Sequence, residues 1–331
     1  MKILVTGGAG YIGSHTALHL IENGHNVTIV DNLSNSSRDV ISKLEQIVEE
    51  PIDFYEFDLR DYHQLKRLFA DKVFDAVIHF AGFKAVGESV ALPVNYYDNN
   101  INTTLNLLKQ LGNTNITKFV FSSSATVYGN PDRCPIDESF PISATNPYGR
   151  TKLFIEEILR DYSTANPNIA VSILRYFNPV GAHKSGLIGE NPKGIPNNLV
   201  PYISQVAAGD LDFLPVYGDD YHTPDGTGIR DYIHIEDLAY GHIKALEYLE
   251  QKSGCFVHNL GTGRGYSVLE VIRAFERVSS KIIPYKIVNR RPGDIAECYA
   301  DPRKAEKELG WKAEKSLEEM LEDTWNFQKK N

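Results

Sequence analysis

Short apolar runs alternate with helical patterns from the start of the chain. Residues 3–5 are a continuous apolar run that ends at a glycine cluster, and residues 14–21 carry apolar side chains three or four positions apart, before Gly24. Residues 26–30, Asn-Val-Thr-Ile-Val, form a second strand-like stretch with apolar residues at positions 27, 29 and 30. Continuous apolar runs are typical of parallel strands that are covered on both faces, so this segment predicts a strand, a helix and a second strand.

The same alternation continues through the first half of the chain, where the period of the apolar positions switches between that of a strand and that of a helix. Further strands are predicted at residues 52–57, 76–80, 119–122 and 169–175. Further helices are predicted at residues 40–50, 61–70, 95–111 and 148–165. Strand–helix alternation of this kind predicts an α/β fold with a doubly wound parallel sheet, covered by helices on both faces.

The composition changes after residue 177. Residues 178–230 are rich in glycine, proline and asparagine, which predicts a smaller C-terminal α/β lobe made largely of loops over a ligand. Later patterns predict a strand that rejoins the main sheet and two helices that complete the lobe, at residues 256–259, 267–278 and 316–328. We therefore predict a first domain over residues 1–177 and a second over residues 178–331.

A glycine triplet marks the turn between the first strand and the first helix. Gly7, Gly10 and Gly13 recur at every third position, and Asp31 follows the second strand. A phosphate can approach the backbone N–H groups at a helix N-terminus only where no Cβ blocks it. Asp31 stands where a carboxylate accepts hydrogen bonds from an adenosine ribose, and its charge would repel a 2′-phosphate. The unit predicts a Rossmann domain that prefers NAD to NADP; the alternative is that the glycines serve only a tight turn.

Charge, cysteine and histidine content limit the classes of function. The 331 residues carry a formal net charge of −9 without a basic cluster, so we expect no binding to nucleic acid or a membrane. We expect no signal peptide, because the first apolar run is short. Cys134, Cys255 and Cys298 are far apart and odd in number, which predicts a reducing, cytoplasmic location without disulfides. His15 and His19 are four residues apart but lack a third ligand, so we expect no metal.

A tyrosine and a lysine at the start of one predicted helix are the candidate catalytic pair. Tyr148 and Lys152 are four residues apart, hence on one helix face, and they follow a serine cluster at residues 122–124. Lowering the tyrosine pKa from about 10 to about 7 takes roughly 4 kcal/mol, which Lys152 and a cationic nicotinamide would supply. Tyr148 would then be a general base, with Ser124 hydrogen-bonded to the same substrate oxygen. The same spacing recurs in three pairs that we interpret as surface helix pairs: Tyr62/Lys66, Tyr240/Lys244 and Tyr248/Lys252.

Motifs spread over nearly the whole chain carry a resemblance to a known family. They lie at residues 7–13, 79–82, 84–89, 122–129, 148–152, 175–182, 194–199 and 230–234. Through them the chain resembles the extended short-chain dehydrogenase/reductase family, and within it the UDP-glucose 4-epimerases. The run Arg-Tyr-Phe-Asn-Pro-Val-Gly-Ala at residues 175–182 is far more specific than the glycine motif.

The resemblance implies tightly held NAD and a homodimer. With the glycine turn, the strand ends and the catalytic pair included, the expected NAD site consists of Gly7, Gly10, Tyr11, Ile12, Gly13, Asp31, Asn32, Asn35, Ser36, Asp58, Leu59, Phe80, Ala81, Gly82, Lys84, Asn99, Tyr148, Lys152 and Tyr176. The predicted helices at residues 95–111 and 148–165 carry apolar residues on more than one face. One stripe would cover the sheet and the other would meet a symmetric partner, although both stripes could be intramolecular.

The resemblance also implies that residues 178–331 form a nucleotide-sugar-binding lobe. The expected substrate contacts are Ser124, Tyr148, Asn178, Asn198, Leu199, Tyr217, Arg230, Arg291, Asp294 and Cys298. Arg230 and Arg291 suit a diphosphate because guanidinium forks bind phosphate oxygens in pairs, although either alone would more simply be a surface ion pair. Tyr217 could stack on uracil. Cys298 matches a pocket wall near the sugar 2-substituent, where a bulky tyrosine excludes N-acetylated sugars; the alternative is ordinary core filling.

The implied reaction is the interconversion of UDP-galactose and UDP-glucose, through transient oxidation to a 4-keto sugar with bound NAD. N-acetylated UDP-sugars are candidate further substrates. Two alternatives are open. A sugar-nucleotide 4,6-dehydratase usually needs Asp-Glu after the serine, whereas Ala125 and Thr126 follow Ser124 here. A non-catalytic dinucleotide-sensing protein of the same fold typically lacks the tyrosine or the lysine, and this chain has both Tyr148 and Lys152.

Overall fold

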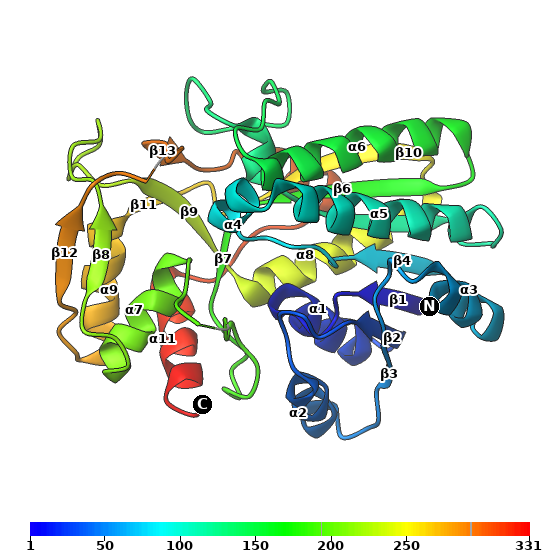
Figure 1. The fold of residues 1–331 in the computed structure, drawn as a ribbon, viewed down its shortest axis with the longest axis horizontal. Helices are drawn as coiled ribbons and strands as arrows, with labels where there is room; N and C mark the ends of the chain where they lie inside the picture. The colour runs from blue at the N-terminus through cyan, green and yellow to red at the C-terminus, as the bar shows by residue number, and fades with distance from the viewer. Residues whose placement is uncertain (193, 292) are drawn as a thin grey trace.

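The computed structural model describes residues 1–192, 194–291 and 293–331, and its core is a parallel sheet (Figure 1). Within these residues the sheet has seven strands in the order β10-β6-β5-β4-β1-β2-β3, and each neighbouring pair is parallel. The strands are β1 (Lys2–Thr6), β2 (Asn26–Asp31), β3 (Asp53–Glu56), β4 (Ala76–His79), β5 (Lys118–Ser124), β6 (Ala170–Tyr176) and β10 (Gly254–Leu260). The predicted doubly wound α/β fold is confirmed.

The strand order reverses between β1 and β4, which are neighbours in the sheet. From β1 the chain proceeds outward to β2 and β3, and it then crosses back to β4 and continues in the opposite direction. The loops after β1 and β4 therefore part to opposite faces, which leaves a crevice beyond the carboxyl ends of the strands. This edge of the sheet is where a ligand is expected.

Two layers of helices cover the sheet (Figure 1). Apolar residues of three helices pack on one face with sheet residues: α1 (Tyr11–Glu22), α2 (Arg38–Val48) and α8 (Ile235–Tyr248). Apolar residues of three others pack on the opposite face: α3 (Tyr62–Asp71), α5 (Pro93–Leu111) and α6 (Pro147–Ala165). Because both faces are covered, β6 is buried along its whole length, including its polar residues Ser172 and Arg175.

The smaller lobe contains more regular structure than the sequence predicts. Its strands β7 (Asn178–Val180), β9 (Ile229–His234), β11 (Gly265–Ser267) and β13 (Glu297–Cys298) form one sheet, and β8 (Leu214–Tyr217) pairs with β12 (Tyr285–Val288). Its helices are α7 (Leu199–Ala208), α9 (Val268–Ser279) and α11 (Leu317–Gln328). Shorter helices are α4 (Val86–Ala91), α10 (Arg303–Leu309), η1 (Ala125–Tyr128) and η2 (Leu249–Gln251). Within the described part of residues 178–230 the regular elements are only β7, α7, β8 and the start of β9, so the expectation that this stretch is mostly loop is confirmed. The additional strands β11, β12 and β13 lie later in the chain, where two to four residues are too short to show periodicity.

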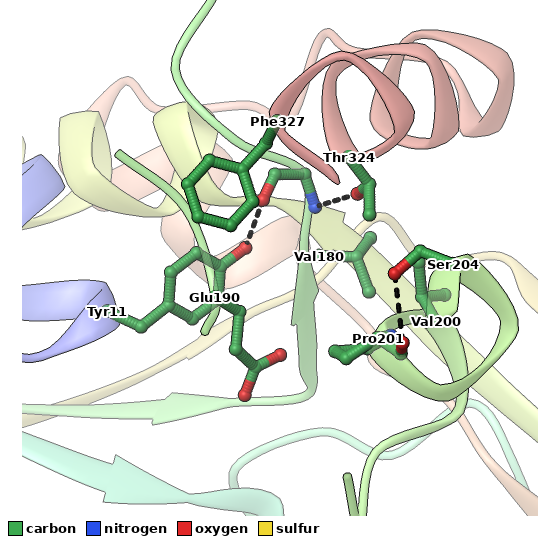
Figure 2. A pocket seen from close by; sticks show the side chains of 9 residues that line it. Tyr11, Val180, Glu190, Val200, Pro201, Ser204, Thr324 and Phe327 are labelled. Carbon is green, nitrogen blue, oxygen red and sulfur yellow. Dashed lines mark hydrogen bonds between the residues drawn. The ribbon is translucent and has the colours of Figure 1, made fainter. Parts of the chain in front are cut away.

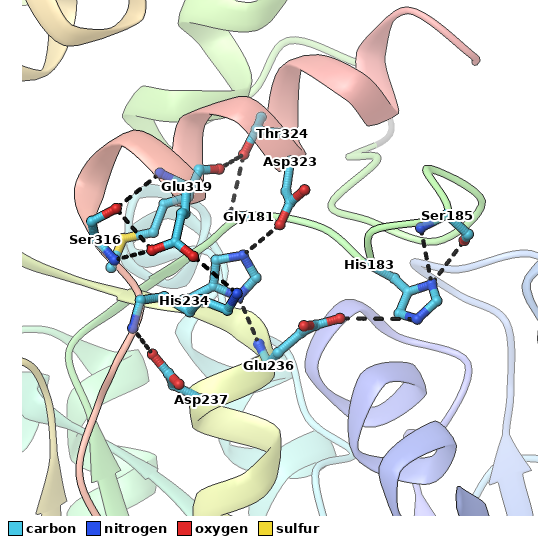
Figure 3. Close-up of polar contacts among 12 residues, drawn as sticks. Gly181, His183, Ser185, His234, Glu236, Asp237, Ser316, Glu319, Asp323 and Thr324 are labelled. Carbon is cyan, nitrogen blue, oxygen red and sulfur yellow. Dashed lines mark hydrogen bonds and ion pairs between the residues drawn. The ribbon is translucent and has the colours of Figure 1, made fainter. Parts of the chain in front are cut away.

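A polar cluster joins the lobe to the layer under the large sheet (Figure 3). His234, at the start of α8, lies with Nε2 3.1 Å from Asp323 Oδ2 of α11, and its Nδ1 accepts from the Glu236 backbone N–H. On the same helix α11, Thr324 Oγ1 accepts a hydrogen bond from the Gly181 N–H at 3.1 Å. These contacts fix the end of β7 against both α8 and α11, so the lobe is held beside the crevice.

Buried histidines make the stability of the fold sensitive to acid. His79 Nδ1 lies 2.7 Å from Thr6 Oγ1 and its Nε2 2.9 Å from Thr104 Oγ1, and burial lowers the pKa of His79 to about 3. Burial also lowers the pKa of His15 to about 3 and of His242 to about 4. The unfolded chain therefore binds more protons than the folded chain between the normal histidine pKa of about 6.5 and these lowered values.

We expect the free energy of unfolding to fall as the pH drops below about 6.5, by up to about 1.4 kcal/mol per pH unit for each such histidine. Urea unfolding at pH 7.5, 6.0 and 5.0 measures this dependence. His79→Gln should flatten it, whereas replacing the exposed His222 by Gln should leave it unchanged. Equal slopes for the native protein and His79→Gln would contradict the assignment.

Candidate active site and cofactor cradle

The glycine turn lies tightly between β1, α1 and the end of β4. Gly7 has a φ of +71°, and a Cβ added to it would lie 2.6 Å from the Ala81 backbone nitrogen. A Cβ added to Gly13 would lie 2.2 Å from the Gly7 carbonyl oxygen. Gly10 caps α1, and its N–H donates to Gly7 O at 3.1 Å. The turn thus brings bare backbone to the helix N-terminus, which fits the pyrophosphate of a dinucleotide.

Asp31 closes the far side of this turn. Its carboxylate accepts hydrogen bonds from the Ala9 N–H at 3.1 Å, from the Leu33 N–H at 2.8 Å and from Ser36 Oγ at 3.1 Å. Burial raises the pKa of Asp31, and these hydrogen bonds oppose the rise. The neighbouring Asn32 donates to Asp58 Oδ2 at 3.0 Å. The ends of β2 and β3 therefore present a ring of polar groups next to the glycine turn, as expected for an adenosine ribose.

The predicted cofactor residues divide between the two sides of the crevice. Those of the β1–β3 side are Gly7, Gly10, Tyr11, Ile12 and Gly13 in the turn and α1, Asp31, Asn32, Asn35 and Ser36 after β2, and Asp58 and Leu59 after β3. Those of the β4–β6 side are Phe80, Ala81, Gly82 and Lys84 after β4, Asn99 on α5, Tyr148 and Lys152 on α6, and Tyr176 at the end of β6. The two groups meet where Thr6 O accepts from the N–H groups of Phe80 and Ala81, at 3.0 and 3.1 Å.

Ser124 and Tyr148 meet at the end of β5. Ser124 Oγ accepts from Thr126 N–H at 3.2 Å and lies 3.0 Å from Thr126 Oγ1, so it begins the short helix η1. Tyr148 is the second residue of α6, which starts because the Asn146 side chain accepts from the Gly149 N–H at 2.8 Å. The Ser124 hydroxyl lies beside the Tyr148 phenol and favours the ionised form of Tyr148, which lowers its pKa. The Asn146 cap thus sets where α6 begins, and this places the Tyr148 phenol next to the serine cluster at residues 122–124.

Lys152 follows Tyr148 by one helical turn and is buried. Its Nζ donates to the Ser122 carbonyl at 2.7 Å and lies 5.9 Å from the centroid of the Tyr148 ring. Burial lowers the pKa of Lys152 to about 8, and the nearby Glu156 carboxylate opposes this effect. The Lys152 ammonium is therefore mostly charged at pH 7, because this pH is only slightly below its pKa of about 8.

The protein alone does not make Tyr148 a base at neutral pH. Burial raises the pKa of Tyr148 to about 12, while the adjacent Ser124 hydroxyl acts in the opposite direction. The value of roughly 4 kcal/mol expected from the sequence applies to a tyrosine exposed to water and does not include this desolvation. Lowering the pKa from about 12 to about 7 requires roughly 7 kcal/mol rather than 4. A larger share must therefore come from positively charged groups bound beside the ring.

The predicted substrate residues of the lobe form two groups. In the first group, the Arg291 guanidinium lies 4.7 Å from the Tyr217 ring centroid and its Nε donates to Asp294 Oδ2 at 2.9 Å. Arg230 on β9 and Cys298 on β13 are partners in register. The second group faces the crevice and consists of Asn178 at the start of β7, Asn198 just before α7, and Leu199, the first residue of α7.

Glu190 is a member of the site that the sequence analysis missed. Its Oε1 accepts from Lys84 Nζ and from Asn198 Nδ2, both at 2.9 Å, so it bridges a predicted cofactor residue and a predicted substrate residue. Figure 2 shows Glu190 beside Tyr11, whose hydroxyl donates to the Gly181 carbonyl at 2.7 Å. Glu190 lies in the stretch read as loop, where the sequence carries no periodic signal.

Two further findings concern the described part of the chain. Among residues 1–192, 194–291 and 293–331, no three His, Cys, Asp or Glu side chains are arranged so that they could hold a metal ion. In the same ranges, no helix has both the length and the apolar character needed to span a membrane.

Comparisons with known proteins agree on one family. A family model described as GDP-mannose 4,6 dehydratase matches residues 4–324. The UDP-glucose 4-epimerase of Bacillus subtilis (strain 168) is 56% identical over 331 residues, which are 100% of this chain and 98% of that relative. A crystal structure of UDP-glucose 4-epimerase from Bifidobacterium longum in complex with NAD+ and UDP is 56% identical with a TM-score of 0.97, and the match covers 100% of this chain and 99% of that one.

A second solved structure extends this result. The UDP-glucose 4-epimerase of Stenotrophomonas maltophila, with bound NAD and formylated UDP-arabinopyranose, is 49% identical with a TM-score of 0.97 and covers 100% of this chain and 98% of its own. The resemblance expected from the sequence motifs is confirmed over the whole length. The chain belongs to the UDP-glucose 4-epimerase family of the extended short-chain dehydrogenases/reductases.

Proposed function

We propose that this protein is an isomerase that interconverts UDP-galactose and UDP-glucose by inverting C4 of the sugar with bound NAD. Residues 1–177 together with β10 would hold NAD, and residues 178–331 would hold the UDP-sugar. The observation that supports this most directly is the placement of Ser124 beside Tyr148, with the buried Lys152 one helical turn further along α6 and the glycine turn across the crevice. The 56% identity to UDP-glucose 4-epimerases supports the same reaction.

Each catalytic side chain then has a separate role. Tyr148 removes the proton from the sugar 4-hydroxyl and returns it after the sugar has turned over in the site. Ser124 hydrogen-bonds the same oxygen, which holds C4 in place during both half-reactions. Lys152 contributes a fixed positive charge that favours the ionised form of Tyr148. NAD supplies the oxidising power, since it accepts the hydride of C4 and gives it back.

The lobe would hold the nucleotide through charge and stacking. Arg230 and Arg291 are the two guanidinium groups that suit the diphosphate, since the protein is otherwise acidic. Arg291 already covers one face of the Tyr217 ring, which leaves the other face for a base such as uracil. Asn178, Asn198 and the start of α7 would close over the sugar. The remaining predicted contacts are Leu199, Asp294 and Cys298.

The sugar-nucleotide 4,6-dehydratase alternative is less well supported. Dehydration needs a carboxylic acid and a carboxylate next to the serine, to protonate the leaving hydroxyl and remove a proton. Here Ala125 and Thr126 occupy these positions, and the Thr126 hydroxyl is bonded to Ser124. Proton NMR and mass spectrometry of the products from UDP-glucose and UDP-galactose distinguish the cases. We expect an isomer of unchanged mass; a product lacking one water would indicate the dehydratase, and no product a sensing protein.

Cys298 supports a broader substrate range. It is half-buried in the wall beside Arg230, and burial raises the pKa of its thiol to about 12, so it is a small neutral group. We expect the native enzyme also to interconvert the N-acetylated UDP-hexosamines. Cys298→Tyr should lower kcat/KM for that pair about tenfold or more relative to UDP-glucose, because overpacking costs ~1–3 kcal/mol. Cys298→Ser should preserve the ratio. An unchanged ratio in Cys298→Tyr would contradict the proposal that the size of residue 298 decides whether N-acetylated UDP-sugars are accepted.

We also propose a homodimer formed by α5 and α6. An apolar groove between them is lined by Leu105, Leu108, Ile158 and Tyr162. One turn before Ile158, the Phe154 side chain is 44% exposed and stacks on Tyr97. A contiguous apolar surface over two long helices suits a symmetric partner.

Light scattering at micromolar concentration should therefore give a dimer. Phe154→Asp should weaken it by about 2 kcal/mol or more, which is about a thirtyfold rise in the dissociation constant. Ile282→Asp, at a more exposed apolar position in the small lobe, is the matched control and should leave the dimer intact. A native monomer would contradict the proposal.

Three cysteines without disulfide partners support a reducing, cytoplasmic location.

A further inference from the structure

A buried ion pair lies directly beneath the candidate catalytic groups. Glu156 on α6 is 0% exposed and Arg175 on β6 is 2% exposed. Arg175 donates from Nε to Glu156 Oε1 at 2.9 Å and from Nη2 to Glu156 Oε2 at 2.6 Å. This is a two-pronged contact between a helix and the strand next to β5, and it fixes α6 against the sheet.

The pair continues into a hydrogen-bonded chain. Ser123 Oγ donates to Glu156 Oε1 at 2.6 Å, and Arg175 Nη1 donates to the Tyr128 hydroxyl at 2.9 Å. Tyr128 in turn donates to Asn259 Oδ1 of β10 at 2.7 Å. The polar groups of the network are thus paired with one another across α6, β5, β6 and β10.

The members of this network are next to the site residues in sequence. Ser123 precedes Ser124, Arg175 precedes Tyr176, and Glu156 follows Lys152 by one helical turn. A buried ion pair is a weak source of stability, because the cost of desolvating two charges offsets their attraction. A role in holding the neighbouring groups accounts better for its place in the fold.

We propose that Glu156 and Arg175 are positioning residues that keep the Lys152 ammonium charged and fix Ser124 and Tyr148 relative to it. The expected effect on kcat rests on the proposed function, whereas the expected effect on the charge of Lys152 does not depend on which reaction the protein catalyses. Glu156 is the carboxylate that favours the charged form of Lys152 against its burial. Arg175 shares the charge of Glu156 with Arg160, whose Nη2 donates to Glu156 Oε2 at 3.0 Å, and it fixes the direction of the carboxylate, so that α6 and β6 keep their register.

The other groups around Lys152 do not replace this carboxylate. Those that face it are the Tyr148 phenol on the same helix, the Ser122 carbonyl and the Phe121 ring on β5, and the His79 imidazole on β4. Burial keeps His79 neutral, and Tyr148 is neutral in the resting protein because its pKa is about 12. Removing the charge of Glu156 therefore leaves the ammonium without a carboxylate among these groups.

The test measures the pKa of Lys152 directly. Protein carrying ¹⁵N-labelled lysine is titrated by NMR with its bound cofactor, and Lys152→Met identifies the resonance. Glu156→Gln should lower this pKa by about one pH unit, as expected for a charge lost about one helical turn away. The alkaline limb of kcat should move to lower pH by the same amount. Asp161→Asn, nine residues after Lys152 at an exposed position of α6, is the matched control and should change neither.

A second variant separates positioning from folding. Glu156→Gln leaves Arg175 buried without its carboxylate, so it should lower the thermal midpoint, and it could fail to fold. The double variant Glu156→Gln/Arg175→Met removes both charges and should recover most of the thermal midpoint while keeping the lowered Lys152 pKa. A native-like Lys152 titration in either variant would overturn the proposal. Absence of epimerisation by the native protein would instead refute the proposed function and leave the NMR result intact.

Discussion

Replacing Tyr148 by phenylalanine should lower kcat by about a hundredfold to ten-thousandfold, while the dissociation constant for UDP changes little. The substitution removes the only group proposed to exchange a proton with the 4-hydroxyl, and general acid–base catalysis contributes a factor of this size. It removes little volume, so the site should keep its shape. Steady-state kinetics and calorimetric titration with UDP measure the two quantities.

The chain offers a matched control for this variant. Tyr240 has the same spacing to a lysine, and Lys244 Nζ lies 5.2 Å from its ring centroid, but Tyr240 is 41% exposed on α8. Tyr240→Phe should leave kcat unchanged. If Tyr148→Phe retains more than a tenth of the native kcat, a loss of less than about 1.4 kcal/mol, Tyr148 is not the base.

Gly13→Ala should destabilise the fold by about 3 kcal/mol and yield protein that has lost most of its NAD. The new Cβ would lie 2.2 Å from the Gly7 carbonyl oxygen and 2.8 Å from Gly8 Cα. These are backbone atoms that cannot rotate away, so the cost should lie at the upper end for overpacking. Thermal unfolding and the nucleotide content of the purified protein measure the effect.

Gly112→Ala is the matched control for this substitution. Gly112 ends α5 with an ordinary φ of −58°, and a Cβ there would meet no atom closer than 3.9 Å. It should change neither the thermal midpoint nor the NAD content appreciably. A Gly13→Ala protein that unfolds and retains NAD like the Gly112→Ala protein would show that the turn does not cradle the cofactor.

Elements with local signals could be predicted from the sequence. The continuous apolar run at residues 3–5 predicts β1, and α6 begins where an asparagine cap and a proline at its first position set the start, at Asn146 and Pro147. The carboxyl-end position of Asp31 and Ser124 followed from the predicted strands. Their roles, and the division of the chain at residue 177, stay predictions.

Other features depend on contacts that the sequence does not display. β7 and β13 have three and two residues and exist only through pairing with β9. Glu190 contacts Lys84, which is 106 positions away in the sequence, as well as the nearby Asn198. The pKa of Tyr148 depends on burial, which only the folded structure gives. The free energy needed to ionise Tyr148 at neutral pH is therefore larger than the sequence alone indicates.

The most direct test of the account is whether the purified native protein converts UDP-galactose without added NAD. We expect UDP-glucose to accumulate until the two sugars reach equilibrium, because the reaction returns the cofactor to its starting state and the cradle retains it. Chromatography of the UDP-sugars over time measures the conversion, with Tyr148→Phe as the inactive comparison. Unchanged UDP-galactose, or conversion only in proportion to added NAD, would contradict epimerisation by a retained cofactor.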